Sequence, residues 1–245
     1  MNLDGKTALI TGGARIGAVV AEALAGRGAR VALSYRSSEN AARETAEAIE
    51  KAGAEVAIFK ADLADPEACS KLVSEVSARL GGLDILVNMA STYVKRDWGE
   101  QGAGAWNEDL NANARSAYLL SIYAAEVMKK SGAGRIINFG DWIAASGRPR
   151  YKGYTTYYTA KAAVRGLTEA LALELAPEIL VNCIAPGPIL PPDELSEAEK
   201  NDVAVATPLG RWGGADEIAK TVLFLIESDF VTGETIRVDG GRHLA

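Results

Sequence analysis

Short apolar runs typical of strands alternate with helical stretches along most of the chain, and this alternation is the feature that most constrains the fold. The predicted strands are Thr7–Ile10, Arg30–Tyr35, Glu55–Lys60, Leu83–Asn88, Arg135–Phe139, Ile179–Ile184 and Thr235–Val238. The predicted helices are Ile16–Arg27, Glu39–Ala52, Pro66–Leu80, Asn111–Lys130 and Tyr154–Leu175. Continuously apolar strands are typical of a parallel sheet covered on both faces. The pattern therefore predicts one α/β domain over residues 1–245, with a doubly wound, seven-stranded parallel sheet and helices on both faces.

Three stretches have little regular pattern, and each follows the end of a predicted strand. They are Thr92–Gly104, Asp141–Gly153 and Gly187–Leu209. In doubly wound sheets, ligands bind beyond the carboxyl ends of the strands. We therefore expect these three stretches to surround the functional site.

Charge and hydropathy exclude several classes of partner. The chain has 26 Lys and Arg against 32 Asp and Glu, a net charge of −6. An acidic chain without a basic stripe is a poor binder of nucleic acid or of anionic lipid. No apolar run approaches the ~20 residues that a membrane-spanning helix needs, and the first strand begins too early to leave room for a signal peptide. We expect a soluble cytoplasmic protein that acts on a small molecule.

Histidine and cysteine usage argues against hydrolytic and metal chemistry. His243 is the only histidine and lies near the C-terminus, so a Ser-His-Asp hydrolase has almost no candidate base. Cys69 and Cys183 lie far apart in apolar surroundings, where we expect buried thiols without a disulfide. No cluster of Cys and His predicts a metal site.

A glycine-rich turn joins the first predicted strand to the first helix, in the sequence Thr11–Gly17. Glycines at this place, here Gly12 and Gly17 around Arg15 and Ile16, allow the backbone to approach a pyrophosphate that sits on the helix N-terminus. An ordinary strand–helix turn would also be glycine-rich. Its position in a first βαβ unit favours a dinucleotide site.

The end of the second strand indicates which dinucleotide. Tyr35, Arg36 and Ser37 stand where an NAD site usually has an acidic residue for the ribose 2′-hydroxyl. Arg and hydroxyl groups suit a 2′-phosphate instead, and no acid occurs before Glu39. The sequence therefore favours NADPH, although Arg36 could also be a solvated charge at the start of the helix.

Tyr157 and Lys161 lie four residues apart at the start of a predicted helix, and so share one of its faces. A free tyrosine has a pKa near ~10 and is a poor proton donor at neutral pH. A nearby cation would favour the phenolate and lower that pKa. This pair is therefore the first candidate for a catalytic acid.

Together these motifs resemble the short-chain dehydrogenase/reductase family over essentially the whole chain. Besides the glycine turn and the Tyr157–Lys161 pair, the matching segments are Asp62–Leu63, Asn88–Ser91, Asn113, Pro186–Gly187, Val231–Glu234 and Val238–Gly241. The resemblance implies a Rossmann fold and an NADPH-dependent oxidoreductase. It implies that Asn113 supports a proton-relay water, and that Tyr157 is the acid and Lys161 its partner. It also places the cofactor against Tyr157, against Lys161, which holds the nicotinamide ribose, and against Asp62, Leu63, Asn88, Ala90, Pro186, Gly187 and Ile189.

Departures from the family pattern point to a particular branch. The glycine turn is one residue short, Met89 replaces an Asn, and Asp141 stands at the position of the usual catalytic Ser, for which Ser146 is the competing candidate. Asp141, Arg15 and Tyr93 resemble the pteridine reductase branch, which implies that Asp141 and Tyr157 serve the substrate and Tyr93 stacks on it. Alternatively, Asp141 caps a turn and Tyr93 packs in a loop.

Three functions remain open. The first is reduction of a C=N bond of a small molecule, possibly a pterin, and the second is reduction of a 3-ketoacyl thioester or another ketone. The third is a dinucleotide-binding sensor with weak catalysis, which the short turn and Met89 favour and the Asn113, Tyr157 and Lys161 set opposes. The resemblance also implies a homotetramer or homodimer built on two helices that carry Ala124, Ala125, Ala162, Ala163 and Leu171.

Overall fold

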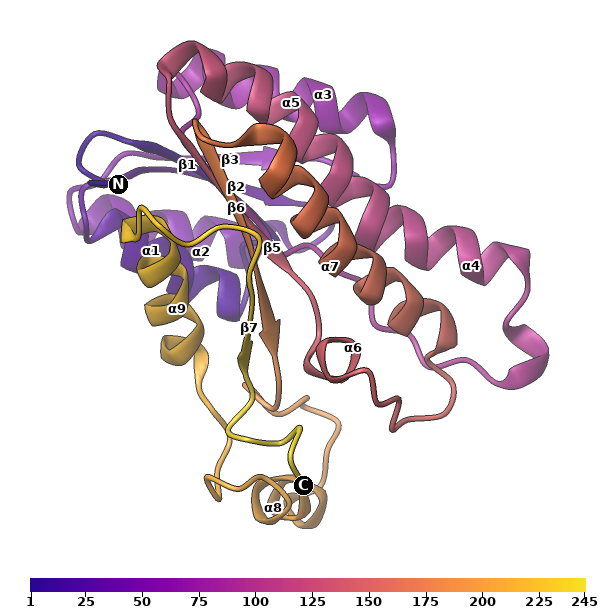
Figure 1. The fold of residues 1–245 in the computed structure, drawn as a ribbon. Helices are drawn as coiled ribbons and strands as arrows, with labels where there is room; N and C mark the ends of the chain where they lie inside the picture. The colour runs from indigo at the N-terminus through magenta and orange to yellow at the C-terminus, as the bar shows by residue number, and fades with distance from the viewer.

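Seven parallel strands form one sheet in a computed structural model that describes residues 1–245 (Figure 1). The spatial order is β3-β2-β1-β4-β5-β6-β7, so the chain reverses its direction of travel across the sheet between β1 and β4. The strands are β1 (Thr7–Thr11), β2 (Arg30–Tyr35), β3 (Val56–Lys60), β4 (Ile85–Asn88), β5 (Gly134–Phe139), β6 (Ile179–Pro186) and β7 (Thr235–Val238). This doubly wound parallel arrangement confirms the predicted Rossmann fold.

Helices cover both faces of the sheet (Figure 1). One face carries α3 (Pro66–Leu80), α5 (Ser116–Ser131) and α7 (Thr155–Leu175), and a core cluster joins their apolar side chains to the strands. The other face carries α1 (Ile16–Ala25), α2 (Glu39–Lys51) and α9 (Ala215–Glu227), with a second core cluster. Strands β1 and β4 are buried along their whole length, whereas the edge strands β3 and β7 are largely half-buried.

The predicted helices and strands all exist, but the long helix predicted from Asn111 is longer and irregular. It begins with α4 (Ala103–Asp109), passes through a π-helical segment η2 (Leu110–Arg115) and continues as α5. Single π-turns inside helices occur mostly at functional sites. The π-helical segment contains Asn113, which the sequence had singled out.

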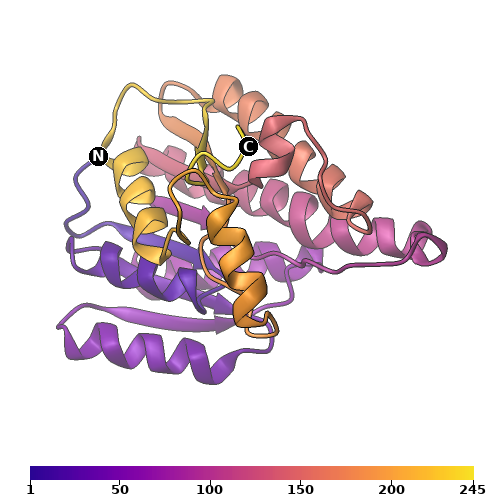
Figure 2. The same ribbon diagram turned by 90° about the horizontal axis from the view of Figure 1, so that it is seen from below.

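Three helices were not predicted. They are α6 (Trp142–Ser146), α8 (Glu197–Val205) and α9, and a 3₁₀ turn η1 (Trp98–Glu100) also escaped prediction. Ser196 and Glu199 cap α8 reciprocally, a signal that the sequence contained. In both views α8 lies beyond the C-terminal ends of the strands, apart from the two helical layers (Figures 1 and 2).

The helix surfaces correct part of the argument for an oligomer. Ala124, Ala125 and Leu171 belong to the core of the chain itself, so they are not available to a partner. Ala162 and Ala163 are exposed on α7. No helix of the protein combines the length and the apolar character that crossing a membrane requires.

Candidate active site

The glycine turn between β1 and α1 has a geometry that requires glycine at two positions. Gly12 has a φ of +78°, and a Cβ atom at Gly17 would lie 2.1 Å from the carbonyl oxygen of Gly12. Arg15 also has a positive φ, of 53°, and its guanidinium donates to the carbonyl of Pro191 at 2.9 Å. The shortened turn therefore still forms a close-packed bend whose backbone a phosphate group can approach.

A cavity of about 190 Å³ opens beside this turn, between the ends of β1, β2 and β4. Seven of the residues predicted to bind the cofactor line it: Gly12, Tyr35, Arg36, Ser37, Asp62, Leu63 and Ala90. Arg36 is exposed at this cavity and forms no ion pair with the protein's own carboxylates. Its guanidinium is therefore free to bind an anionic group.

The other predicted cofactor residues lie outside this cavity. Asn88 is buried, and its amide group donates to Asn138 Oδ1 at 2.9 Å and to Ser121 Oγ at 3.3 Å, so it fastens β4 to β5 and α5. Gly187 follows β6, where a Cβ atom would lie 2.5 Å from the Asp239 side chain. The remaining residues of this group are Arg15, Ile16, Gly17, Pro186 and Ile189, of which Ile189 is buried in the core.

A second cavity, of about 270 Å³, lies between the segment after β4 and the start of α7. Five tyrosines dominate its lining, together with one carboxylate, one guanidinium and smaller side chains: Tyr93, Asp141, Ile143, Pro149, Arg150, Tyr151, Tyr154, Thr155, Tyr157 and Tyr158. Aromatic walls with a few polar groups are typical of small-molecule sites.

Tyr157 and Asp141 form the polar end of this cavity, and Lys161 is buried behind Tyr157. The Tyr157 hydroxyl donates to Asp141 Oδ2 at 3.2 Å. The ammonium group of Lys161 is buried, donates to the carbonyl of Phe139 at 2.8 Å and lies 5.8 Å from the centre of the Tyr157 ring. The predicted catalytic pair therefore shares one face of α7, as its spacing indicated.

The pKa of Tyr157 contradicts the expected effect of Lys161. Burial raises the pKa of Tyr157 well above its usual value, and the Asp141 carboxylate raises it further. Burial also lowers the pKa of Lys161 to about 8, which weakens it as a cation at alkaline pH. In the protein without a bound cofactor, desolvation therefore outweighs the attraction between phenolate and ammonium.

Asp141 caps a short helix, as one interpretation of the sequence held, and also contacts Tyr157. Its Oδ1 atom accepts the backbone N–H of Ile143 at 2.7 Å and so caps α6, while its Oδ2 atom faces Tyr157. Burial raises the pKa of Asp141 above its ordinary value, with opposing contributions from the Ile143 bond and from Lys161. Ser146 lies at the far end of α6, bonds to the carbonyl of Trp142 and does not line the cavity.

Tyr93 packs on other tyrosines of the cavity, not elsewhere in its loop. Its ring stacks on Tyr154 with centres 4.4 Å apart and an interplanar angle of 12°, and it meets the edge of Tyr157 at 4.7 Å. Tyr93 is 55% exposed and does not belong to the buried core. The sequence did not single out Tyr151, Tyr154 or Tyr158, although their position just before and inside the Tyr157 helix was a usable signal.

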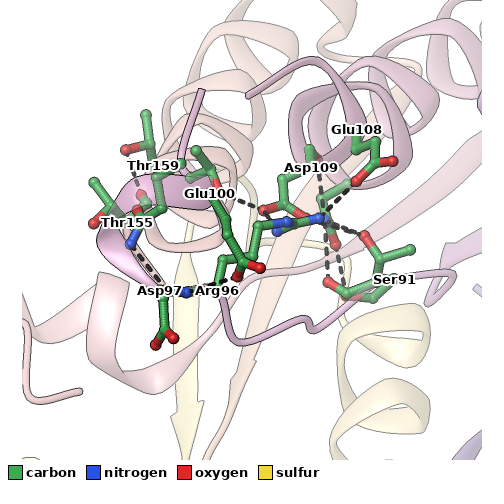
Figure 3. A network of polar contacts seen from close by, with 12 residues as sticks. Ser91, Arg96, Asp97, Glu100, Glu108, Asp109, Thr155 and Thr159 are labelled. Carbon is green, nitrogen blue, oxygen red and sulfur yellow. Dashed lines mark hydrogen bonds and ion pairs between the residues drawn. The ribbon is translucent and has the colours of Figure 1, made fainter. Parts of the chain in front are cut away.

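Asn113 lies beside the cavities, and both polar atoms of its side chain form hydrogen bonds within the protein. Its Oδ1 atom accepts from Ser91 Oγ at 2.6 Å, and its Nδ2 atom donates to the carbonyl of Asp109 at 3.0 Å and to Thr92 at 3.2 Å. The amide therefore holds the segment after β4 in place. Sequence reasoning missed Asp109, which is completely buried in the polar network drawn in Figure 3.

Comparison with known proteins identifies relatives over the full chain. Residues 13–243 match the family described as enoyl-(acyl carrier protein) reductase. The 3-oxoacyl-(acyl-carrier-protein) reductase FabG of Escherichia coli is 35% identical over 251 residues, which cover 100% of both chains. The short-chain reductase protein NovJ of Streptomyces niveus is 38% identical, over 97% of this chain and 94% of its own.

Solved structures show the same architecture. A short-chain dehydrogenase from Burkholderia cenocepacia in complex with NADP superposes with a TM-score of 0.91 at 34% identity, over 100% of both chains. FolM alternative dihydrofolate reductase 1 from Brucella canis, complexed with NADP, superposes with a TM-score of 0.91 at 30% identity, over 100% of this chain and 97% of its own.

Proposed function

This chain belongs to the short-chain dehydrogenase/reductase family, and we propose that it is an NADPH-dependent reductase of a planar, pterin-like small molecule with a C=N bond. The observation that carries the proposal is the pair formed by Asp141 and Tyr157, whose side-chain oxygens lie 3.2 Å apart in a tyrosine-lined cavity. A carboxyl group at this place suits a ring nitrogen as its partner. An ionised Asp only accepts hydrogen bonds and cannot polarise a carbonyl as a Ser hydroxyl does.

The choice of NADPH rests on the first cavity and on the relatives. Arg36 and Ser37 would hold the 2′-phosphate, Asp62 and Leu63 the adenine, and the turn from Gly12 the pyrophosphate. The glycine bend, which a Cβ atom would block, and the unpaired guanidinium both fit such a group. NADPH, when bound, supplies the hydride that adds to the substrate carbon and is itself oxidised to NADP⁺.

The proton comes from the chain itself. We assign to Tyr157 the one proton that reduction of a C=N bond consumes, and to Asp141 the role of holding a ring nitrogen of the substrate. Burial raises the pKa of both groups and so favours the protonated form of each. Lys161 would hold the nicotinamide ribose, and Asn113 would keep the segment after β4 in register with the site.

Aromatic stacking would select the shape of the substrate. Tyr93 and Tyr154 already stack on each other, so a flat heteroaromatic ring can replace one of these contacts with another of the same kind. The exposed position of Tyr93 allows this exchange. A flexible acyl chain would gain less from the same walls.

A second candidate is the reduction of a 3-oxoacyl thioester. The observation that favours it is the 35% identity with the FabG reductase of Escherichia coli over the whole of both chains. A binding-only sensor is disfavoured, because Tyr157 and Asp141 meet at one cavity and Lys161 lies next to the Tyr157 ring.

The test measures how fast the purified protein oxidises NADPH, with the loss of NADPH absorbance as the readout. The acceptors to be compared are dihydropterins, dihydrofolate, 3-oxoacyl thioesters, quinones and sugars. We expect the highest kcat/KM with a dihydropterin or dihydrofolate. A preference of 10-fold or more for the thioester would establish the second candidate and overturn the first. No turnover with any acceptor, despite tight NADPH binding, would support the sensor.

A further inference from the structure

We infer that Asp109 is a positioning residue, which fixes the segment after β4 and the first turn of α7 relative to each other and thereby sets the geometry of Asn113 and Tyr157. The inference rests on the proposed function, because it assigns Asp109 a part in that same reaction. Asp109 touches neither cavity, so its effect passes through its neighbours.

The carboxylate of Asp109 is completely buried and binds donors from two separate parts of the chain. Its Oδ2 atom accepts from Arg96 Nη1 at 2.8 Å and from the hydroxyl of Thr156, and its Oδ1 atom accepts from Thr92 Oγ1 at 3.4 Å. Figure 3 shows the Arg96 guanidinium beside Asp109 and Glu108. Thr92 and Arg96 belong to the segment after β4, whereas Thr156 opens α7.

The free-energy cost of burying two charges indicates that this network fixes the positions of its residues and adds little to the stability of the fold. The side chain of Arg96 is 11% exposed and that of Asp109 is 0% exposed. Removing both charges from water costs several kcal/mol per ion, and well-packed apolar residues often stabilise a fold as well as a buried pair does. What the pair adds is a directional link, since each donor must meet the carboxylate at one angle and distance.

One branch of the network leads to Asn113. The carbonyl oxygen of Asp109 accepts from Asn113 Nδ2 at 3.0 Å, and the π-helical segment that carries Asn113 begins at the next residue. Thr92 bonds to the Asp109 carboxylate and also accepts from Asn113 Nδ2. Displacing Asp109 would therefore disturb two partners of the Asn113 amide, the Asp109 carbonyl and Thr92.

The other branch leads to Tyr157. Thr156, which Asp109 holds through its hydroxyl, directly precedes Tyr157 in α7. Arg96 also donates its backbone N–H to the carbonyl of Gly153 at 2.9 Å, just before that helix. The same segment carries Tyr93, whose ring meets the edge of Tyr157 at 4.7 Å. Asp109 therefore ties the Tyr157 ring to its aromatic neighbour.

The test compares Thr156→Val, which removes one bond to Asp109 and keeps the Arg96–Asp109 pair, with Thr156→Ser, which keeps the hydroxyl. We expect Thr156→Val to lower kcat roughly 10-fold or more while the KM for NADPH stays within about two-fold. Thr156→Ser should restore kcat to within about two-fold of the wild type. Asp109→Asn should lower kcat at least as much if it folds.

A purely stabilising role would give a different result. Thr156→Val would then lower Tm, yet the folded variant would keep the wild-type kcat, and this outcome would overturn the inference. Hydrogen–deuterium exchange of the NADPH-bound protein gives a readout independent of turnover. We expect faster exchange in residues 91–97 of Thr156→Val but not of Thr156→Ser, and unchanged exchange would contradict the coupling. A wild type that reduces no acceptor defeats the proposed function, whereas the exchange comparison still tests whether Asp109 couples the segment after β4 to α7.

Discussion

The Tyr157 hydroxyl and the Asp141 carboxylate lie 3.2 Å apart, although Tyr157 belongs to the first turns of α7 and Asp141 follows the end of β5. Burial raises the pKa of both groups, which favours the protonated form of each beside one aromatic cavity. A single tyrosine acid would suffice for a ketone. A second donor is useful where a ring nitrogen must also be bound or protonated.

Replacing Asp141 by Ser separates the two substrate classes. With a dihydropterin, Asp141→Ser should lower kcat/KM by ~100-fold or more, because the ring nitrogen loses its partner. With a 3-oxoacyl thioester, activity should hold or rise, since the Ser hydroxyl donates to a carbonyl. Steady-state kinetics on both substrates provide the measurement, and equal losses on both would contradict the assignment of Asp141.

The pH dependence should report the same carboxyl group. Burial raises the pKa of Asp141, and only its protonated form can donate. With the pterin-like substrate, kcat/KM should therefore rise as pH falls toward this raised pKa and decline above it. An asparagine side chain does not titrate, so the pH profile of Asp141→Asn should lack this decline. A wild-type profile that is flat over the same range would argue against a protonated Asp141.

Arg36 should decide between the two dinucleotides. A charge-assisted contact from its guanidinium to the 2′-phosphate contributes ~1.5–3 kcal/mol. The wild type should therefore bind NADPH about 10-fold or more tighter than NADH, and Arg36→Asp should reverse the order. Fluorescence titration measures both constants, with Arg43→Asp in the neighbouring α2 as a control of equal charge change. Equal affinity of the wild type for both cofactors would refute this choice.

The burial of Lys161 should appear in the stability of the cofactor-free protein. Its folded pKa of about 8 lies below the ordinary lysine pKa of 10.5, so between these values the unfolded chain binds more protons. Stability then rises with pH, and the contribution of Lys161 becomes less unfavourable by about 2 kcal/mol between pH 7 and pH 10. The test measures the free energy of unfolding of the wild type and of Lys161→Met at both pH values. The wild type should gain stability relative to Lys161→Met as the pH rises.

Assembly is expected to use the exposed small residues of α7. Ala162, Ala163, Gly166 and Ala170 are all exposed, and a stripe of this kind lets another helix approach closely. We predict a homodimer or homotetramer that Ala163→Glu dissociates, whereas Ala48→Glu on exposed α2 leaves it intact. Light scattering measures the mass. A monomeric wild type at micromolar concentration would contradict the prediction.

Local patterns were enough to predict the sheet, most of its flanking helices and the Tyr157–Lys161 face, because period and spacing determine these directly. The flanking helix α9 was missed, although the apolar Val222, Leu225 and Ile226 recur at helical spacing and were a usable signal. The sign of the Tyr157 pKa shift was wrong for a different reason. Charge pairing follows from spacing, but desolvation depends on the whole surrounding fold.

The buried polar network could not be predicted from the sequence. Asp109 lies in a polar stretch that reads as a solvated helix, and only the fold brings Arg96 and Thr156 to it. The motif of Asn88 predicts a cofactor contact, and the structure adds a role that the motif did not indicate, because the side-chain amide links two strands and a helix. Such contacts join residues 13 to 50 positions apart, where spacing carries no information.

The most direct test of the central claim is Tyr157→Phe, which removes one hydroxyl and keeps the aromatic ring. If Tyr157 is the acid, kcat with the preferred substrate should fall by ~100-fold or more while the Kd for NADPH stays within about three-fold. If Tyr157→Phe keeps most of the wild-type kcat, the proton comes from another group, and the account of this site is wrong.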